Sequence, residues 1–279
     1  MVGNTRVTGK EQYYTPYDTA SQVLDRLLTI RPHLTGCSWI EPSGGTGCFV
    51  DVLESRGITD VVSFDIEPHH LQVQKANFID DTTQFTADVA IGNPPFGRNN
   101  ALSIPFFNKC ADTCDIICFI VPRSWRKWSV TNRLNLNFAV IDDYDLQINY
   151  VDVNGQLLSD NSHLRTCVQT WERTSPARQK IVVEDRGIIQ KCNPSEADAA
   201  LTIFGFSCGT VRTDFPRVAN TTQMFVKLRH PKALEALRSV EYARFFNHTA
   251  YTQALSLQEI NFLLNEYIFG DGGIIPQQK

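Results

Sequence analysis

The chain has 279 residues, but no apolar run in it approaches the roughly 20 residues of a membrane-spanning helix. Its N-terminus, MVGNTRVTGKEQYY, also lacks the apolar stretch of a secretion signal. We therefore expect a cytoplasmic protein, or one that works at the nucleoid or in a host cytoplasm. The length suits one large domain, or one domain with a small appendage.

Metal-binding patterns are also scarce, although the chain has eight cysteines. It contains no CxxC pair and no histidine-rich segment, so we predict no metal site and free thiols in a reducing compartment. Cys110, Cys114 and Cys118 recur every four residues, but the third falls in the strand-like segment IICFIV, and we expect buried structural thiols. The net charge of -4 disfavours nonspecific coating of nucleic acid and still allows a local basic cleft.

The first two-thirds of the chain alternate short apolar strands with amphipathic helices. This order predicts an α/β fold with a largely parallel sheet that is covered on both faces. Expected strands cover 61–68, 87–97, 115–122, 137–146 and 163–173, expected helices cover 11–28 and 101–114, and a strand, glycine turn and helix follow one another over 37–57.

The rhythm changes at about residue 185, which predicts a second, smaller α/β region. Strand-like segments cover 200–209 and 223–228, and amphipathic helices are expected over 232–246 and 256–269. We therefore expect a main domain over residues 1–184 and a small C-terminal region over residues 185–279.

The segment EPSGGTG, from Glu41 to Gly47, follows one expected strand and opens a helix. Glycines let the backbone approach a ligand closely, and a helix start presents free N–H groups, so this turn is typical of a nucleotide-type site. Asp65 ends the next strand, about 20 residues beyond the glycines, where a carboxylate accepts the hydroxyls of a ribose. The alternatives are a tight turn without a ligand and a surface carboxylate that caps a turn. No basic residue accompanies the glycines, which favours a ligand without a pyrophosphate.

The segment AIGNPPFG, residues 90–97, forms a stiff polar elbow behind an apolar strand. Its two prolines fix φ and forbid a helix, so the carbonyl groups keep one direction. The glycines on either side give the backbone room. The alternative is a rigid loop without a catalytic role.

Five segments in this order, EQYYTP, IEPSGGTGCF, FDIEP, ANFID and IGNPPFG, resemble the motifs of class I S-adenosylmethionine-dependent amino-methyltransferases. More narrowly, the chain resembles adenine-N6 DNA methyltransferases of phage and restriction systems, whose cofactor motifs precede an Asn-Pro-Pro-aromatic motif. The resemblance covers residues 10 to about 175. It implies a Rossmann-like, mostly parallel seven-stranded sheet, a catalytic domain over residues 1–184, and target recognition by residues 185–279.

The same resemblance implies S-adenosylmethionine as the cofactor and assigns the site residues. Those implied to bind the cofactor are Tyr13, Thr15, Pro16, Glu41, Gly44, Gly47, Asp65, Ile66, Asn77, Phe78 and Asn93. Those implied to act in catalysis are Asn93, Pro94, Pro95 and Phe96. Asp65 would hold the ribose, and Ile66 would pack on the adenine of the cofactor. Asn77 departs from the aspartate that is commoner in this family.

The elbow has a chemical rationale in this setting, because the exocyclic amine of adenine is a poor nucleophile whose lone pair is delocalised into the ring. The side-chain oxygen of Asn93 and the backbone carbonyl of Pro94 would accept its two N–H bonds, and Phe96 would stack on the base. No general base need act first, provided that the reacting atoms meet at roughly 3–3.5 Å.

A base inside a duplex reaches such a pocket only if it is flipped out or already single-stranded. The segment PRSWRKW interleaves Arg123, Arg126 and Lys127 with two tryptophans, which suits phosphate contacts and base stacking. The alternative is a solvated loop over two packed tryptophans. Trp171 is a further stacking candidate and equally a candidate core residue. Phosphate contacts or a solvated face would explain Lys227, Arg229, Lys232 and Arg238.

We therefore predict an enzyme that methylates the N6 amine of adenine in DNA, either in a duplex with a flipped base or in a single strand. The same chemistry on RNA is an alternative that the motifs do not separate. Methylation of a protein glutamine is another, although that family's glycine motif more often begins with aspartate. A non-catalytic nucleic-acid-binding module is a third, which the intact elbow disfavours. Neither a membrane nor a metal is expected as a partner.

Overall fold

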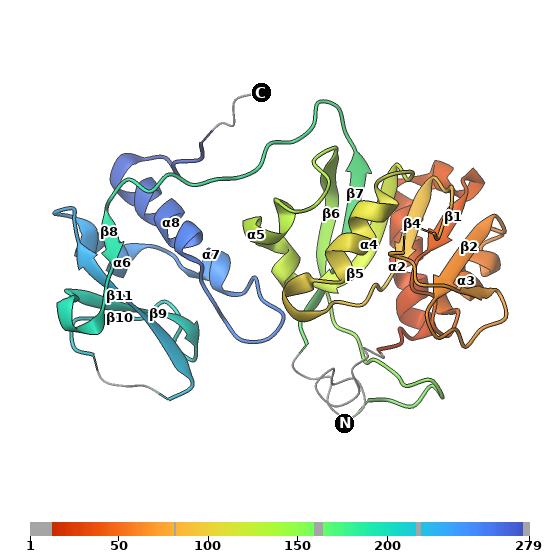
Figure 1. The fold of residues 1–279 in the computed structure, drawn as a ribbon, viewed down its shortest axis with the longest axis horizontal. Helices are drawn as coiled ribbons and strands as arrows, with labels where there is room; N and C mark the ends of the chain where they lie inside the picture. The colour runs from red at the N-terminus through yellow and green to blue at the C-terminus, as the bar shows by residue number, and fades with distance from the viewer. Residues whose placement is uncertain (1–12, 81, 159–163, 216–218, 276–279) are drawn as a thin grey trace. The chain divides into compact units, whose positions relative to one another are not determined.

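The computed structural model describes residues 13–80, 82–158, 164–215 and 219–275, and the chain divides into two compact units (Figure 1). The first unit comprises residues 1–123 and 129–178, and the second comprises residues 124–128 and 179–279. The division after residue 178 lies close to the expected boundary after residue 184. The sequence pattern does not predict that residues 124–128 belong to the second unit.

A seven-stranded sheet in the order β3-β2-β1-β4-β5-β7-β6 forms the first unit. The strands are β1 (Trp39–Glu41), β2 (Val61–Asp65), β3 (Val73–Lys75), β4 (Val89–Gly92), β5 (Ile116–Pro122), β6 (Phe138–Leu146) and β7 (Thr166–Arg173). Neighbours among β1 to β5 pair in parallel, whereas β7 runs antiparallel to both β5 and β6. The expected α/β fold with a mostly parallel, seven-stranded sheet is confirmed.

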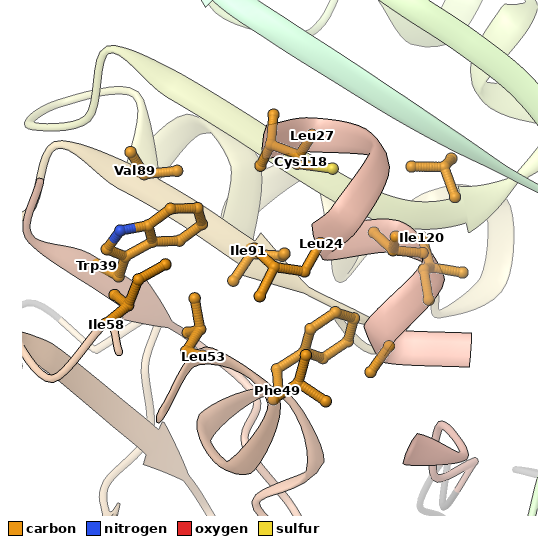
Figure 2. Close-up of a cluster of buried hydrophobic side chains, with 14 of the residues drawn as sticks. Leu24, Leu27, Trp39, Phe49, Leu53, Ile58, Val89, Ile91, Cys118 and Ile120 are labelled. Atoms are coloured by element: carbon orange, nitrogen blue, oxygen red, sulfur yellow. The ribbon is translucent and has the colours of Figure 1, made fainter. Parts of the chain in front are cut away.

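Helices cover both faces of this sheet. They are α2 (Tyr17–Ile30), α3 (Cys48–Ser55) and α4 (Ser103–Cys110), with 3-10 turns η1 (Pro32–Gly36) and η2 (Arg98–Asn100). The turn η3 (Arg123–Arg126) and the short helix α5 (Trp128–Thr131) lie where the chain passes between the units, and their residues 124–128 belong to the second unit. Figure 2 shows the core on one face, where Leu24 of α2, Leu53 of α3 and Ile91 of β4 are fully buried together. Phe107 of α4 contacts Trp171 on the opposite face, with ring centroids 5.6 Å apart. Each such buried side chain contributes about 1.5–3 kcal/mol.

The second unit has a four-stranded antiparallel sheet in the order β10-β9-β11-β8. Its elements are β8 (Ile189–Lys191), η4 (Pro194–Glu196), β9 (Ala199–Gly205), β10 (Val211–Arg212), β11 (Thr221–Leu228), α6 (Ala233–Ser239), α7 (Ala243–Phe246) and α8 (Leu257–Phe269). A separate buried cluster joins Leu201 and Val226 of the sheet to Leu237 of α6 and Leu263 of α8. The short strands β8 and β10 are additions to the elements that the sequence predicts for this region.

The topology sets where polar strand ends meet. β2, β1 and β4 are consecutive neighbours in the sheet and run parallel, so their carboxyl ends share one edge. Glu41 ends β1, Asp65 ends β2, and Asn93 follows β4 directly. In open α/β sheets, ligands bind in the crevice outside such strand ends. The predicted cofactor and catalytic motifs therefore share one region of the fold.

Candidate active site

The elbow after β4 is fixed by its own backbone contacts. The carbonyl of Phe96 accepts the N–H groups of Leu102 and Ser103, at 3.3 and 3.4 Å, so the elbow closes onto the start of α4. Pro94 is buried, and Phe96 is 7% exposed. The elbow is therefore a defined structure rather than an extended loop.

The Asn93 side chain has one fixed end and one open end. Its Nδ2 donates to the carbonyl oxygen of Tyr13, at 3.3 Å, and to Oγ1 of Thr15, at 3.2 Å. Its Oδ1 is buried and accepts no hydrogen bond from the described residues. A buried acceptor without a donor costs about 1–3 kcal/mol, so Oδ1 is the atom that a bound N–H group would satisfy.

The segment before α2, residues 13–16, lies beside the Asn93 elbow and the glycine turn. The backbone of Tyr14 pairs with Val151 through two hydrogen bonds of 3.1 Å, and the ring of Tyr13 packs on Tyr150 with centroids 5.3 Å apart. Thr15 is 7% exposed and Pro16 precedes the helix directly. Residues 11 and 12 of the EQYYTP motif lie outside the described residues.

The glycine turn and Asp65 are joined by hydrogen bonds. Asp65 Oδ2 accepts the N–H of Gly45 at 2.8 Å, and Oδ1 accepts the N–H of Glu67 at 2.8 Å. Gly44 donates its N–H to the carbonyl of Phe64 at 2.9 Å. A carboxylate has about four lone-pair sites, so each oxygen of Asp65 retains capacity for a ligand hydroxyl.

Side chains of the chain itself occupy the space beside the glycines. A Cβ on Gly45 would lie 2.7 Å from Cε1 of Tyr14, and a Cβ on Gly47 would lie 2.3 Å from Cγ of His70. At Gly44 it would lie 2.2 Å from Oγ of Ser63. The chain's own side chains therefore demand glycine at these three positions.

Glu41 is a buried acid at the centre of this edge. It is 3% exposed, and its Oε2 accepts no hydrogen bond from the described residues. Burial, helped by the negative charges of Asp65 and Asp51, raises the pKa of Glu41 to about 8. A Cβ placed on Gly92 would lie 3.4 Å from Cγ of Glu41, so this side chain reaches the backbone that carries Asn93.

The three residues predicted to lie beside the cofactor adenine differ in their exposure. Ile66 is 57% exposed directly after β2. Asn77 is exposed, and its carbonyl accepts the hydroxyl of Thr83 at 2.9 Å. Phe78 is 1% exposed because its ring packs among other aromatic rings, including Phe106 at 5.2 Å. Phe78 is therefore a core residue in this structure, and its place beside the cofactor stays a prediction.

Sequence reasoning missed Tyr14, Ser43 and Ser63. Tyr14, rather than Tyr13, lies against the glycine turn, and its pKa is raised by burial and by the charges of Asp65 and Glu67. The hydroxyls of Ser43 and Ser63 are buried and make no hydrogen bond within the described residues. Two adjacent tyrosines in an extended segment point to opposite sides, and the sequence does not say which side faces the turn.

The predicted basic groove is divided between the two units. Arg123 pairs with Asp145 of β6 at 2.8 Å within the first unit. Lys127 belongs to the second unit, where it pairs with the buried Glu259 at 3.1 Å. Arg126, also in the second unit, is half-buried. Arg123 and Lys127 are therefore each engaged by a carboxylate of the chain itself.

The tryptophans of the same segment are packed. Trp125 is fully buried, and Trp128 packs on the rings of Phe245 and Phe262 with centroids 5.3 Å away from each. Neither ring is presented as a stacking platform in this structure. The alternative of two packed tryptophans agrees with these contacts. In the C-terminal region, Lys227 pairs with Glu196 at 3.3 Å.

Trp171 lies at the wrong end of the sheet for base stacking. On β7 it stands opposite Ile117, whereas Thr166 stands opposite Pro122, the last residue of β5. Because β7 is antiparallel to β5, Trp171 lies near the amino end of β5, away from the edge that holds Asn93. It is 3% exposed, which agrees with the alternative that Trp171 is a core residue.

The strand order, the antiparallel β7 and polar groups at the ends of β1, β2 and β4 define the class I methyltransferase fold. Over 95 residues the chain is 30% identical to the Type II methyltransferases M.HincII of Haemophilus influenzae and M.HindII of its strain Rd. The matched stretch is 33% of this chain, and the chain covers only 18% of the length of each relative. The predicted resemblance to methyltransferases is thus confirmed.

Among solved structures, a proposed RNA methyltransferase of Pyrococcus horikoshii is 18% identical, with a TM-score of 0.48, over 59% of this chain and 88% of that chain. No family model matches the chain. Within the described ranges, no three metal-ligating side chains gather, and no helix combines the length and apolarity needed to cross a bilayer. All eight cysteines are free thiols.

Proposed function

We propose that this chain transfers a methyl group from S-adenosylmethionine to the N6 amine of an adenine in DNA. The observation that carries the proposal is the Asn93 carboxamide, whose amino end is fixed and whose buried oxygen lacks a donor. The amine of a flipped adenine would donate one N–H to this oxygen. The carbonyl of Pro94, aimed by the proline ring, would accept the other.

The residues at the same edge fit the cofactor. Glu41 is a buried acid without a donor, and the hydroxyl of Ser43 in the same turn also lacks a partner among the described residues. These groups suit a ligand that brings an ammonium group, and the remaining lone pairs of Asp65 suit ribose hydroxyls. Ile66 would pack on the adenine of the cofactor. When bound, S-adenosylmethionine supplies a methyl group on a positively charged sulfur.

The chain's own contribution is to hold the target amine and to stabilise the charge that develops on it. Asn93 and Pro94 would draw its N–H bonds out of the plane of the ring, which frees the nitrogen lone pair for attack. Both acceptors also stabilise the amine as it becomes positive. The N–CH3 bond would form as the S–CH3 bond of the cofactor breaks, and the extra proton on the nitrogen would then pass to water. Preorganised groups of this kind contribute typically about 3–4 kcal/mol each. Phe96 would contact the face of the base.

The test is a methyl-transfer assay with labelled cofactor on duplex DNA, single-stranded DNA, RNA and protein in parallel. Digestion of the labelled product to nucleosides identifies the modified atom, and N6-methyladenine from DNA is the expected result. Label only in RNA would show that RNA is the substrate in place of DNA, with the same methyl transfer to adenine. Label only in protein, as N5-methylglutamine, or label in no substrate would reject the proposal.

A further inference from the structure

We infer that Thr15 is a positioning residue that holds the Asn93 carboxamide in place and thereby keeps its oxygen aimed at the target amine. The inference rests on the proposed function and extends it, because the resemblance places Thr15 at the cofactor. In the structure the Thr15 hydroxyl instead accepts a hydrogen bond from Asn93 Nδ2, at 3.2 Å.

The orientation of the amide follows from the chemistry of its two partners. The carbonyl of Tyr13 is an acceptor only, so the end of the Asn93 side chain that faces it, at 3.3 Å, must be the amino group. The hydroxyl of Thr15 lies within reach of the same amino group and accepts its second hydrogen. With both amino hydrogens engaged, Oδ1 points away from these partners and keeps its lone pairs for a donor.

A flipped amide would defeat the proposed chemistry. It would place Oδ1 against the carbonyl of Tyr13, which has no hydrogen to give, and would present two N–H groups to an amine that itself needs acceptors. The carbonyl of Tyr13 alone excludes the flip, because the hydroxyl of Thr15 can donate as well as accept; Thr15 adds a second contact that holds the amide plane in place. The contribution of Thr15 is therefore to catalysis rather than to the affinity of the cofactor.

The Thr15 hydroxyl is well placed for such a task. Thr15 is 7% exposed, Tyr14 before it pairs with Val151 through two backbone hydrogen bonds, and Pro16 after it accepts the N–H of Ala20 in the first turn of α2. The hydroxyl is thus held between a backbone pair and a helix start. Since Tyr14 lies against Gly45, the same short segment also contacts the cofactor turn.

The test compares Thr15→Val, which keeps the shape and removes the acceptor, with Thr15→Ser, which keeps the acceptor. Thr19→Val, in the first turn of α2, is the matched control. In single-turnover methylation of duplex DNA we expect Thr15→Val to be slower by roughly three- to tenfold, the effect of one ordinary hydrogen bond. Cofactor affinity should stay unchanged, Thr15→Ser should recover most of the rate, and Thr19→Val should retain it.

A second readout does not depend on activity. The side-chain amide protons of Asn93, assigned by their absence in Asn93→Ala, should shift in the ¹⁵N–¹H spectrum and exchange faster with water in Thr15→Val. If the wild type methylates nothing, the proposed function fails and this spectrum alone decides the inference. An unchanged spectrum in Thr15→Val overturns it. So does an unchanged methylation rate, or a loss that appears wholly as weaker cofactor binding.

Discussion

At the scale of single residues, the site depends on groups whose polar partners are incomplete. Glu41 and Asn93 each hold a buried oxygen that accepts no hydrogen bond from the described residues. Such atoms weaken the free protein, because a buried acceptor without a donor costs free energy. They persist at sites where a ligand supplies the missing donor, which is how we interpret this pair.

Glu41 gives the free protein a specific dependence on pH. An ordinary glutamate has a pKa of about 4.3 in an unfolded chain, and burial raises that of Glu41 to about 8 in the folded protein. The folded state therefore holds one more proton than the unfolded state between these two values. The stability that protonated Glu41 contributes is fully present below the lower pKa. It is lost as the pH rises through the upper pKa, by up to ~1.4 kcal/mol per pH unit.

We expect Glu41→Gln, which stays neutral, to gain stability relative to the wild type as the pH rises from 5 to 8. The measurement is the free energy of unfolding by urea for both proteins across this range. Glu54→Gln, on the outer face of α3, is the control and should track the wild type. Parallel curves for Glu41→Gln and the wild type would show that Glu41 ionises normally in the fold.

At the scale of elements, two glycines beside α3 separate two reasons for glycine: a left-handed backbone and a close neighbouring side chain. Gly47 and Gly57 both have left-handed φ, at +79° and +77°. Gly57 follows α3 in open space, whereas a Cβ on Gly47 would meet the ring of His70 at 2.3 Å. The two positions therefore share the strain of a left-handed side chain and differ in crowding.

We predict that Gly57→Ala costs about 1–2 kcal/mol of stability, the strain of a left-handed alanine. Gly47→Ala should cost a further ~1–3 kcal/mol because the ring of His70 must move. Thermal unfolding of both variants separates the two terms. Cofactor binding should weaken only in Gly47→Ala. Equal losses of stability in the two variants would mean that the contact with His70 has no energetic weight.

The elements themselves could be predicted well from the sequence, and their long-range relations could not. Alternating apolar strands and helices determine a parallel sheet, and this pattern places Asp65 and Asn93 at strand ends. The direction of β7 depends on its pairing with β5, so no local pattern shows that Trp171 lies at the opposite edge. The burial of Phe78 likewise depends on Phe106, which is brought by a distant helix.

At the scale of the whole molecule, one short segment from the first two-thirds of the chain is part of the C-terminal unit. Residues 124–128, most of which form the 3-10 turn η3 after β5, belong to the second unit. Within that unit Lys127 pairs with Glu259, which is 2% exposed and also accepts the N–H and hydroxyl of Ser256. The sequence suggested a basic groove here because spacing alone does not distinguish a phosphate contact from an internal ion pair.

We predict that Lys127→Met destabilises the second unit by about 3–5 kcal/mol, because it leaves the carboxylate of Glu259 buried without a cation. Hydrogen exchange of the α8 backbone measures this loss, and Lys180→Met, at an exposed lysine of the same unit, is the control. Normal protection of α8 in Lys127→Met would show that Glu259 does not depend on this lysine.

The central claim is that the Asn93 oxygen holds the amine that receives the methyl group. The most direct measurement is the single-turnover methylation rate of Asn93→Ala beside its cofactor affinity, with Asn154→Ala, in an exposed loop, as control. We predict a loss of about 10²–10³-fold in rate for Asn93→Ala, unchanged cofactor affinity, and a normal rate for Asn154→Ala. Turnover of Asn93→Ala at the wild-type rate would contradict the account.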